Sequence, residues 1–316
     1  MIEVENLQKH FGTKVAVDGV SFTVNKGEVL GFLGPNGAGK STTMRMVTGY
    51  LPPTDGKISI DGVDIEDDEI AAKARIGYLP EAAPLYSDMT VEGFLRFSAE
   101  MRGVPSGELD AAVDNAIKTT FLEPVRHQSI DTLSKGYRHR TCFAQSIIHD
   151  PEILILDEPT DGLDPNQKHE IRQLIRRMGK EKAIIFSTHI LEEVEAACTR
   201  AIIIDRGRVI ADGTPDELKA RAAKAGAVLL RAKGLAGTGI EKELDKMGES
   251  EKVEVIESDD EGITAMVYPA KGKKENLSTA IYSLCKEKNL TIEELRVEEG
   301  RLDDLFREIT KTDAED

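Results

Sequence analysis

The stretch GFLGPNGAGKSTTM, residues 31–44, decides how the amino-terminal part of the chain folds. The pattern G-x-x-x-x-G-K-[ST] is met by Gly34, Gly39, Lys40 and Ser41. Its glycines let successive backbone N–H groups turn inward toward phosphate oxygens, and the helix that follows adds the positive end of its dipole. The loop is therefore predicted to hold a nucleoside triphosphate, with Lys40 on the β- and γ-phosphates and Ser41 on magnesium.

A second motif, ILILDE at residues 153–158, supplies two acidic side chains. Its apolar residues predict a buried strand that ends at Asp157, and ligands in open α/β sheets bind at the carboxyl ends of strands. A carboxylate there can hold magnesium, usually through water. Glu158 follows directly and is predicted to activate a water molecule for attack on the γ-phosphate. Buried strands often end in an acid, so this assignment depends on the phosphate loop.

The next predicted strand, IIFSTH, ends at His189. A single histidine is more often a packing or surface residue than a functional one. Its position one strand beyond Asp157, on the same sheet edge, nevertheless predicts that it reaches the γ-phosphate. His189 therefore joins Lys40 and Glu158 as a catalytic candidate.

The composition sets limits on the class of protein. The chain has 316 residues, enough for about two domains, and is 40% hydrophobic and 31% charged. Its net charge of −16 is opposite to the basic stripe of most nucleic-acid binders, so no nucleic-acid partner is expected. The three cysteines are far apart and give no disulfide or metal pattern. Without a signal peptide or a long apolar run, the chain is expected to be cytoplasmic, or attached to a membrane only through a partner.

Strand and helix periodicity divides the chain into two domains. Alternating apolar residues at the start predict a small antiparallel sheet, a helix is expected to run from the phosphate loop to Pro52, and residues 85–148 have helical spacing. Strands then alternate with helices, which predicts a parallel sheet covered on both faces. The fold class is α/β, with a P-loop ATPase core in residues 1–220. Residues 221–316 read β-α-β-β-α-β and predict a small ferredoxin-like α/β domain.

Taken together, the motifs resemble those of a known family. The order of the phosphate loop, LSKGYRHR at 133–140, ILILDEPTDGLDP at 153–165 and STH at 187–189 resembles the ATP-binding subunits of ABC transporters. The resemblance extends from residue 1 to about residue 218. It implies hydrolysis of ATP with magnesium as cofactor, coupled to transport through separate membrane permease subunits. It also implies a second ATPase subunit, expected to be an identical copy, so that each subunit closes the other's site.

The resemblance also assigns individual residues. Phe11 is expected to stack on adenine, with Val15 and Val17 beside the base, and an aromatic strand-edge residue is also common in cores. Ser134 and Gly136 are expected to touch the γ-phosphate bound by the other subunit. The nucleotide contacts of the loop are expected at Asn36, Gly37, Ala38, Gly39, Lys40, Ser41 and Thr42. The metal ligands are expected to be Ser41, Glu81 and Asp157.

Three residues depart from the family pattern. The family has a signature motif that usually reads LSGGQ and here reads LSKGY, residues 133–137. Lys135 and Tyr137 replace its first glycine and its glutamine, and Glu81 stands where the family has glutamine. Lys135 could attract the γ-phosphate or point to solvent. A branch of bacterial exporters, which includes the gliding-motility-associated type, shares these features and favours export. Residues 82–101, which follow Glu81, are expected to line the groove that accepts the permease.

Two other functions stay open. One is an import ATPase with a ligand-sensing tail, since only resemblance to a branch sets the direction of transport. The other is a soluble ABC-type ATPase acting on ribosomes or DNA, which the single phosphate loop and the acidic charge disfavour. The carboxy-terminal domain could be a sensor, a dimer-stabilising module or a dock for the permease.

Overall fold

The computed structural model describes residues 1–82, 84–234, 239–258 and 262–310. The chain forms two compact units, Met1–Pro215 and Asp216–Asp316. The predicted boundary lay near residue 220, and the predicted permease groove includes Ala83, which lies outside the described residues. None of the described helices combines the length and apolar character needed to cross a membrane.

The first unit is built on a six-stranded sheet with the order β10-β9-β3-β8-β7-β6. Its strands are β3 (Val29–Leu33), β6 (Ile76–Leu79), β7 (Ile153–Asp157), β8 (Ala183–Thr188), β9 (Arg200–Asp205) and β10 (Arg208–Gly213). All neighbours are parallel except β10, which runs antiparallel to β9. Every residue of β3, β7 and β8 is buried, as expected for parallel strands covered on both faces.

A smaller antiparallel sheet packs onto this core, as the sequence predicted. It has the order β2-β1-β4-β5, with β1 (Ile2–Phe11), β2 (Lys14–Val24), β4 (Asp55–Ile60) and β5 (Val63–Asp64). One apolar cluster joins the two sheets, and within it the Phe22 and Phe32 ring centroids are 5.4 Å apart. Because Phe32 lies on β3, this contact fixes the small sheet against the strand that leads into the phosphate loop.

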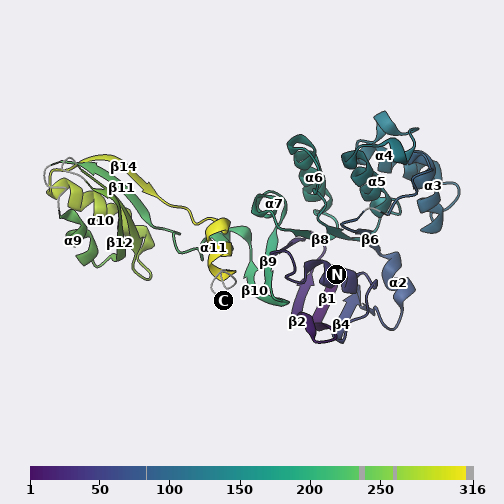
Figure 1. Ribbon diagram of the computed structural model, residues 1–316, viewed down its shortest axis with the longest axis horizontal. Helices are drawn as coiled ribbons and strands as arrows, with labels where there is room; N and C mark the ends of the chain where they lie inside the picture. The colour runs from purple at the N-terminus through teal and green to yellow at the C-terminus, as the bar shows by residue number, and fades with distance from the viewer. Residues whose placement is uncertain (83, 235–238, 259–261, 311–316) are drawn as a thin grey trace. The chain divides into compact units, whose positions relative to one another are not determined.

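Helices surround the large sheet. The helices of the first unit are α1 (Lys40–Val47), α2 (Glu69–Ala74), α3 (Val91–Met101), α4 (Leu109–Thr119), α5 (Lys135–Ile147), α6 (Pro165–Met178) and α7 (Leu191–Ala197), with 3-10 turns at Glu123–Val125 and Ile130–Thr132. Helices α3, α4 and α5 form a subdomain with its own apolar core and appear as a separate group in Figure 1. This group is the helical subdomain expected at 85–148.

One local prediction is corrected, and one hairpin is added to the expected elements. Helix α1 ends at Val47 rather than near Pro52. Gly49 adopts φ +70°, and the backbone N–H groups of Gly49 and Tyr50 donate to the carbonyl oxygens of Met46 at 2.9 Å and Arg45 at 2.8 Å, which closes the helix. The stretch RAIIIDRGRVIADG is a hairpin of two strands, β9 and β10. Its turn is made by Arg206 at φ 47° and Gly207 at φ +78°, which are the left-handed conformations that a tight hairpin needs.

The second unit has the predicted ferredoxin-like arrangement. Its elements are β11 (Val228–Lys233), α9 (Ile240–Lys246), β12 (Ser250–Ser258), β13 (Gly262–Pro269), α10 (Lys274–Glu287), β14 (Thr291–Val297) and α11 (Leu302–Ile309), preceded by the short α8 (Pro215–Lys219). The sheet order is β12-β13-β11-β14, and all neighbouring strands are antiparallel. An apolar core between this sheet and helices α9 and α10 makes the unit self-contained.

Candidate nucleotide-binding site

A cavity of about 540 Å³ opens where the phosphate loop meets the small antiparallel sheet. Predicted site residues make up most of its wall. The lining residues are Phe11, Lys14, Ala16, Asn36, Gly37, Gly39, Lys40, Ser41, Thr42, Glu81 and Glu158. Ala38, also predicted, is buried behind the loop at 3% exposure. The cavity has the size of a small-molecule site and the polar lining that a phosphate needs.

The backbone of the loop depends on glycine at one position in particular. Gly39 caps helix α1 with φ +108°, and a Cβ there would lie 2.6 Å from the Ala16 carbonyl oxygen. Any other residue would therefore be strained and would also push the loop away from β2. The first residue of the helix, Lys40, is buried at 6% exposure. Its Nζ donates to the carbonyl oxygens of Gly34 at 2.7 Å and Pro35 at 3.2 Å.

Lys40 is also close to acidic groups. Its Nζ lies 3.9 Å from Glu158 Oε1. Burial lowers the pKa of Lys40, and the negative charges of Glu158, Asp157 and Glu81 act in the opposite direction. A desolvated ammonium group at the mouth of a helix is a strong site for an anion, since little water competes for it.

Asp157 lies below the cavity and is 1% exposed. Its Oδ1 accepts hydrogen bonds from the hydroxyls of Ser41 at 3.2 Å and Ser187 at 2.5 Å. Its Oδ2 is buried and accepts no hydrogen bond from any residue that the structure describes. A buried carboxylate oxygen without a hydrogen-bond donor, next to a serine hydroxyl, fits a magnesium site. Magnesium is usually bound by one or two carboxylates together with the phosphates of the substrate.

Glu158 lies at the turn that follows β7. Its φ of 51° is uncommon for a residue with a side chain, and its backbone N–H donates to Ser187 Oγ at 3.1 Å. Both carboxylate oxygens lie 3.1 Å from His189 Nδ1. Burial raises the pKa of Glu158, and the hydrogen bond from His189 and the charge of Lys40 oppose that effect. The geometry therefore brings together the three predicted catalytic residues.

The residues of β2 that line the cavity differ from those predicted to lie beside adenine. Lys14 and Ala16 line the cavity, whereas Val17 is fully buried in the core and Val15 lies outside the lining set. Successive residues of a strand point to opposite faces, so the prediction chose the wrong face of β2. Phe11 lines the cavity as predicted for an adenine platform. It is 49% exposed, and Lys9 Nζ is 5.4 Å from its ring centroid.

The signature residues lie apart from the cavity. Ser134 caps helix α5 by accepting a hydrogen bond from the Tyr137 backbone N–H at 3.3 Å. Among the described residues that line the cavity, neither Ser134 nor Gly136 occurs. Asp164 caps α6 in the same manner, accepting from the Gln167 N–H at 2.9 Å.

Sequence reasoning missed two polar residues at the site. Ser187 holds both acidic residues, through the side chain of Asp157 and the backbone of Glu158. The polar end of an otherwise apolar strand was the available signal, but only its histidine was singled out. Lys14 lines the cavity next to Phe11, and nothing in its local sequence distinguishes it from other surface lysines.

A phosphate loop between β3 and α1, with paired carboxylates at the end of β7, defines a P-loop nucleoside triphosphatase. The chain matches the ABC transporter family over residues 17–161. It is 37% identical over 222 residues to the linearmycin resistance ATP-binding protein LnrL of Bacillus subtilis, a match that covers 70% of this chain and 71% of that protein.

Two further comparisons agree. Nod factor export ATP-binding protein I of Ralstonia nicotianae is 38% identical over 219 residues, covering 69% of this chain and 68% of that protein. A solved structure of an ATP-binding subunit of an ABC transporter superposes with a TM-score of 0.65 at 31% identity, covering 69% of this chain and 92% of that one. The chain belongs to the ABC transporter ATP-binding proteins, and it is an ATP-binding and ATP-hydrolysing subunit.

Proposed function

We propose that two copies of this chain bind two ATP molecules between them and power export through separate membrane permease subunits. The proposal that two subunits share each site rests on one observation, the set of residues that line the cavity. The cavity is lined by most of the phosphate loop together with Glu81 and Glu158, but Ser134 and Gly136 are absent from the described lining. A second subunit can supply them, and an identical copy is the simplest source.

Magnesium is the proposed cofactor beside ATP. Ser41, Asp157 and Glu81 would hold it, and the Asp157 oxygen that lacks a hydrogen bond within the described residues supports that choice. Bound there, the ion would neutralise charge on the phosphates. Glu81 adds a negative charge that the usual glutamine would not, so this site is expected to favour a divalent cation strongly.

The reaction follows from the positions of three side chains. Lys40 binds the β- and γ-phosphates and stabilises charge on the transferring group. Glu158 accepts a proton from the attacking water, and its raised pKa suits a general base. His189, 3.1 Å from both oxygens of Glu158, orients that carboxylate and lies next to the expected γ-phosphate position.

Export is favoured over import by the relatives. One of the relatives described above is named for the export of Nod factor, and the other is named for resistance to linearmycin. The import ATPase with a ligand-sensing tail stays the second candidate. The chain is proposed to lie in the cytoplasm at the inner face of the cell membrane, held there by its permease.

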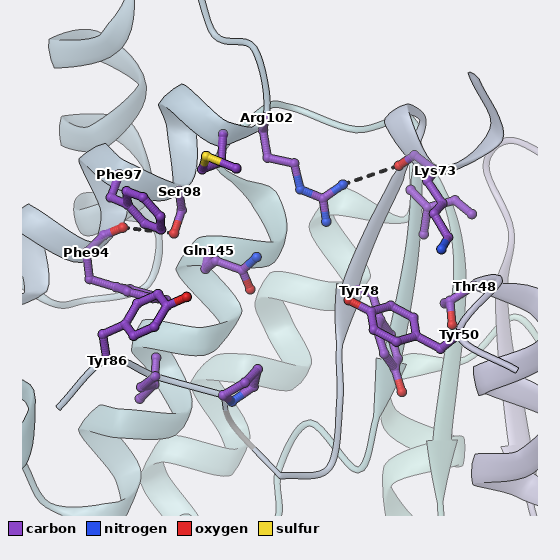
Figure 2. Close-up of a pocket in the computed structure, with 14 residues that line it drawn as sticks. Thr48, Tyr50, Lys73, Tyr78, Tyr86, Phe94, Phe97, Ser98, Arg102 and Gln145 are labelled. Atoms are coloured by element: carbon purple, nitrogen blue, oxygen red, sulfur yellow. Dashed lines mark hydrogen bonds between the residues drawn. The ribbon is translucent and has the colours of Figure 1, made fainter. Parts of the chain in front are cut away.

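A second cavity, of about 600 Å³, supports the proposed permease contact (Figure 2). On one side Tyr86, Phe94 and Phe97 pack together, with ring centroids 5.7–6.1 Å from Tyr86. On the other, Tyr50 and Tyr78 are 5.4 Å apart. The groove lies between the helical subdomain and the core, so a permease helix in it would contact both.

The groove is bordered by two parts of the first unit, and some of its lining residues follow the proposed metal ligand Glu81 in the chain. The Arg102 guanidinium, at the end of α3, donates to the Lys73 carbonyl oxygen at 3.3 Å across the groove. Pro84, Leu85 and Tyr86 line it and follow Glu81 closely in the chain. A movement at Glu81 could therefore be passed to a helix bound in the groove.

The shared site is tested with Glu158→Gln. The amide keeps the size of the side chain but cannot accept the proton of water, so turnover is expected to fall roughly a hundred- to ten-thousand-fold while ATP stays bound. Size-exclusion chromatography with light scattering should then show a dimer only with magnesium and ATP. A monomer with near-normal turnover would reject Glu158 as the base. A monomer without turnover would reject a shared site formed in the absence of the permease.

The permease groove is tested with Tyr86→Asp, and with Tyr282→Asp on α10 as a matched control. The two tyrosines are similarly exposed, at 56% and 52%. A charge at Tyr86 is expected to abolish transport and co-purification with the permease, while turnover of the purified chain persists. Transport by Tyr282→Asp should be unaffected. If both variants transport normally, the groove lies elsewhere.

A further inference from the structure

Lys135, the first residue of α5, has a defined partner. Its Nζ is 2.9 Å from Asp161 Oδ2, in the loop between β7 and α6. The stem of the side chain lies over Gly162, where a Cβ would come within 2.5 Å of Lys135 Cε and Nζ. Gly162 also adopts φ +70°, a conformation that disfavours other residues. The lysine is therefore seated on the loop rather than pointing freely into solvent.

That loop carries the proposed general base. The Asp161 backbone N–H donates to the Glu158 carbonyl oxygen at 3.1 Å, which closes a tight turn. Within the turn, the Thr160 hydroxyl donates to Glu193, a carboxylate that is 1% exposed. The turn is thus fixed on its buried side by Glu193 and on its exposed side by Lys135.

The turn has a conformation that needs support. Glu158 has a φ of 51°, and a side-chain-bearing residue keeps such a backbone only when its surroundings hold it there. The position of its carboxylate against His189 follows from that backbone. Loss of the Lys135–Asp161 contact should therefore loosen the turn and make the position of the Glu158 carboxylate less well defined.

We propose that Lys135 is a positioning residue for Glu158 and acts through Asp161. The inference rests on the proposed role of Glu158 as general base. It assigns the unusual lysine of the signature to a contact within its own subunit, not to the γ-phosphate. Because α5 begins at the signature, any shift of that helix on meeting the partner's nucleotide would be passed to the subunit's own Glu158.

The expected effects are modest because the pair is exposed, with side chains 69% and 52% accessible. Exposed ion pairs of this kind correspond to roughly two- to fivefold in a rate. Lys135→Ala and Asp161→Asn should each lower kcat by about that factor, with KM for ATP unchanged. The double variant Lys135→Ala with Asp161→Asn should be no worse than either single one, since both remove the same interaction.

The decisive variant exchanges the charges. Lys135→Asp combined with Asp161→Lys should recover kcat, because the pair is restored in reverse. Arg208→Ala, which removes the exposed pair with Asp18, is the control for losing a surface ion pair in the same unit. Its kcat should equal that of the wild type. Equal thermal midpoints would show that all variants are folded.

Three results would overturn the inference. Unchanged kcat in Lys135→Ala would make the pair an inert surface contact. A raised KM for ATP that the charge exchange fails to restore would place Lys135 on the phosphate. Normal turnover in Glu158→Gln, measured alongside, would remove the proposed base itself. A nearly inactive Glu158→Gln with a fully active Lys135→Ala would reject this inference and leave the proposed function standing.

Discussion

Helices α1 and α5 both begin with a lysine, Lys40 and Lys135, yet the surroundings of the two lysines differ. Lys40 is 6% exposed and donates to two carbonyl oxygens of its own loop. The Lys135 side chain is 69% exposed and pairs with a carboxylate. The first helix end lies in a walled cavity, and the second lies at the surface. The two helix starts of one chain therefore differ in burial, as the proposed sharing of a site between two subunits requires.

The difference in burial changes how strongly each ammonium group interacts with nearby charges. A buried ammonium group interacts through a low dielectric and is little screened, whereas an exposed one is weakened by water and salt. Burial also lowers the pKa of Lys40. Substitution of Lys40 should therefore lower kcat much more than substitution of Lys135.

The largest effect is expected for Lys40→Ala. The triphosphate would lose the ammonium group of the loop, and kcat should fall by roughly a hundred- to a thousandfold, with weaker ATP binding. Steady-state turnover and binding of an ATP analogue measure both. Lys135→Ala, the other lysine at a helix start, is the matched control. Equal losses in the two variants would contradict the claim that the buried lysine matters more to turnover than the exposed one. Unchanged turnover in Lys40→Ala would reject the phosphate-loop assignment.

Ser187→Ala should have the next largest effect. Its hydroxyl donates to Asp157 at 2.5 Å and accepts from the Glu158 N–H at 3.1 Å. A hydrogen bond to a charged group is worth about 1.5–3 kcal/mol, so kcat should fall by roughly ten- to a hundredfold. Kinetics at saturating ATP measure the loss. Ser187→Thr, which keeps the hydroxyl, should retain more activity, and an equal loss in both would point to packing instead.

The pH dependence of turnover should be smaller and should separate the two carboxylates. Burial raises the pKa of Glu158 above its usual 4.5, and the ionised form is the base, so kcat should fall as the pH decreases through that raised value. Lys135 lowers the pKa of Asp161, which stays ionised throughout. At the pH equal to the pKa of Glu158, kcat should be about half its plateau.

A pH–rate profile of the wild type and of Asp161→Asn measures this. Both should lose activity at the same pH if Glu158 is responsible. A decline at or below pH 4.5, or one that moves with Asp161→Asn, would contradict the assignment.

Removing the second unit should have the smallest effect. Among the residues that the structure describes, those that line the cavity beside the phosphate loop lie within Met1–Pro215. A chain shortened to residues 1–220 is therefore expected to bind an ATP analogue with the affinity of the full chain. Calorimetry measures the affinity, and circular dichroism checks folding. A folded shortened chain that fails to bind would refute the independence of the two units.

The sequence by itself determined the parts that depend on neighbours along the chain. Residues 31–44 predicted the phosphate loop because glycine, lysine and serine act through one continuous backbone segment. The order of strands and helices along the second unit was readable because its periodicities alternate clearly, and the observed order β11, α9, β12, β13, α10 and β14 agrees with it. Asp157 and Glu158 were identifiable because a buried strand ends there.

Only the tertiary structure decided which segments meet. Strand β2 presents Lys14 and Ala16 to the cavity, although its alternation allowed either face. The pairing of β1 with β2 shifts register between Lys9 and His10, and a shift of one residue turns the side chains that follow to the opposite face. The contacts of Ser187 with Asp157 and of Lys135 with Asp161 join segments 30 and 26 residues apart. No local pattern encodes such contacts, because packing of the whole unit brings the partners together.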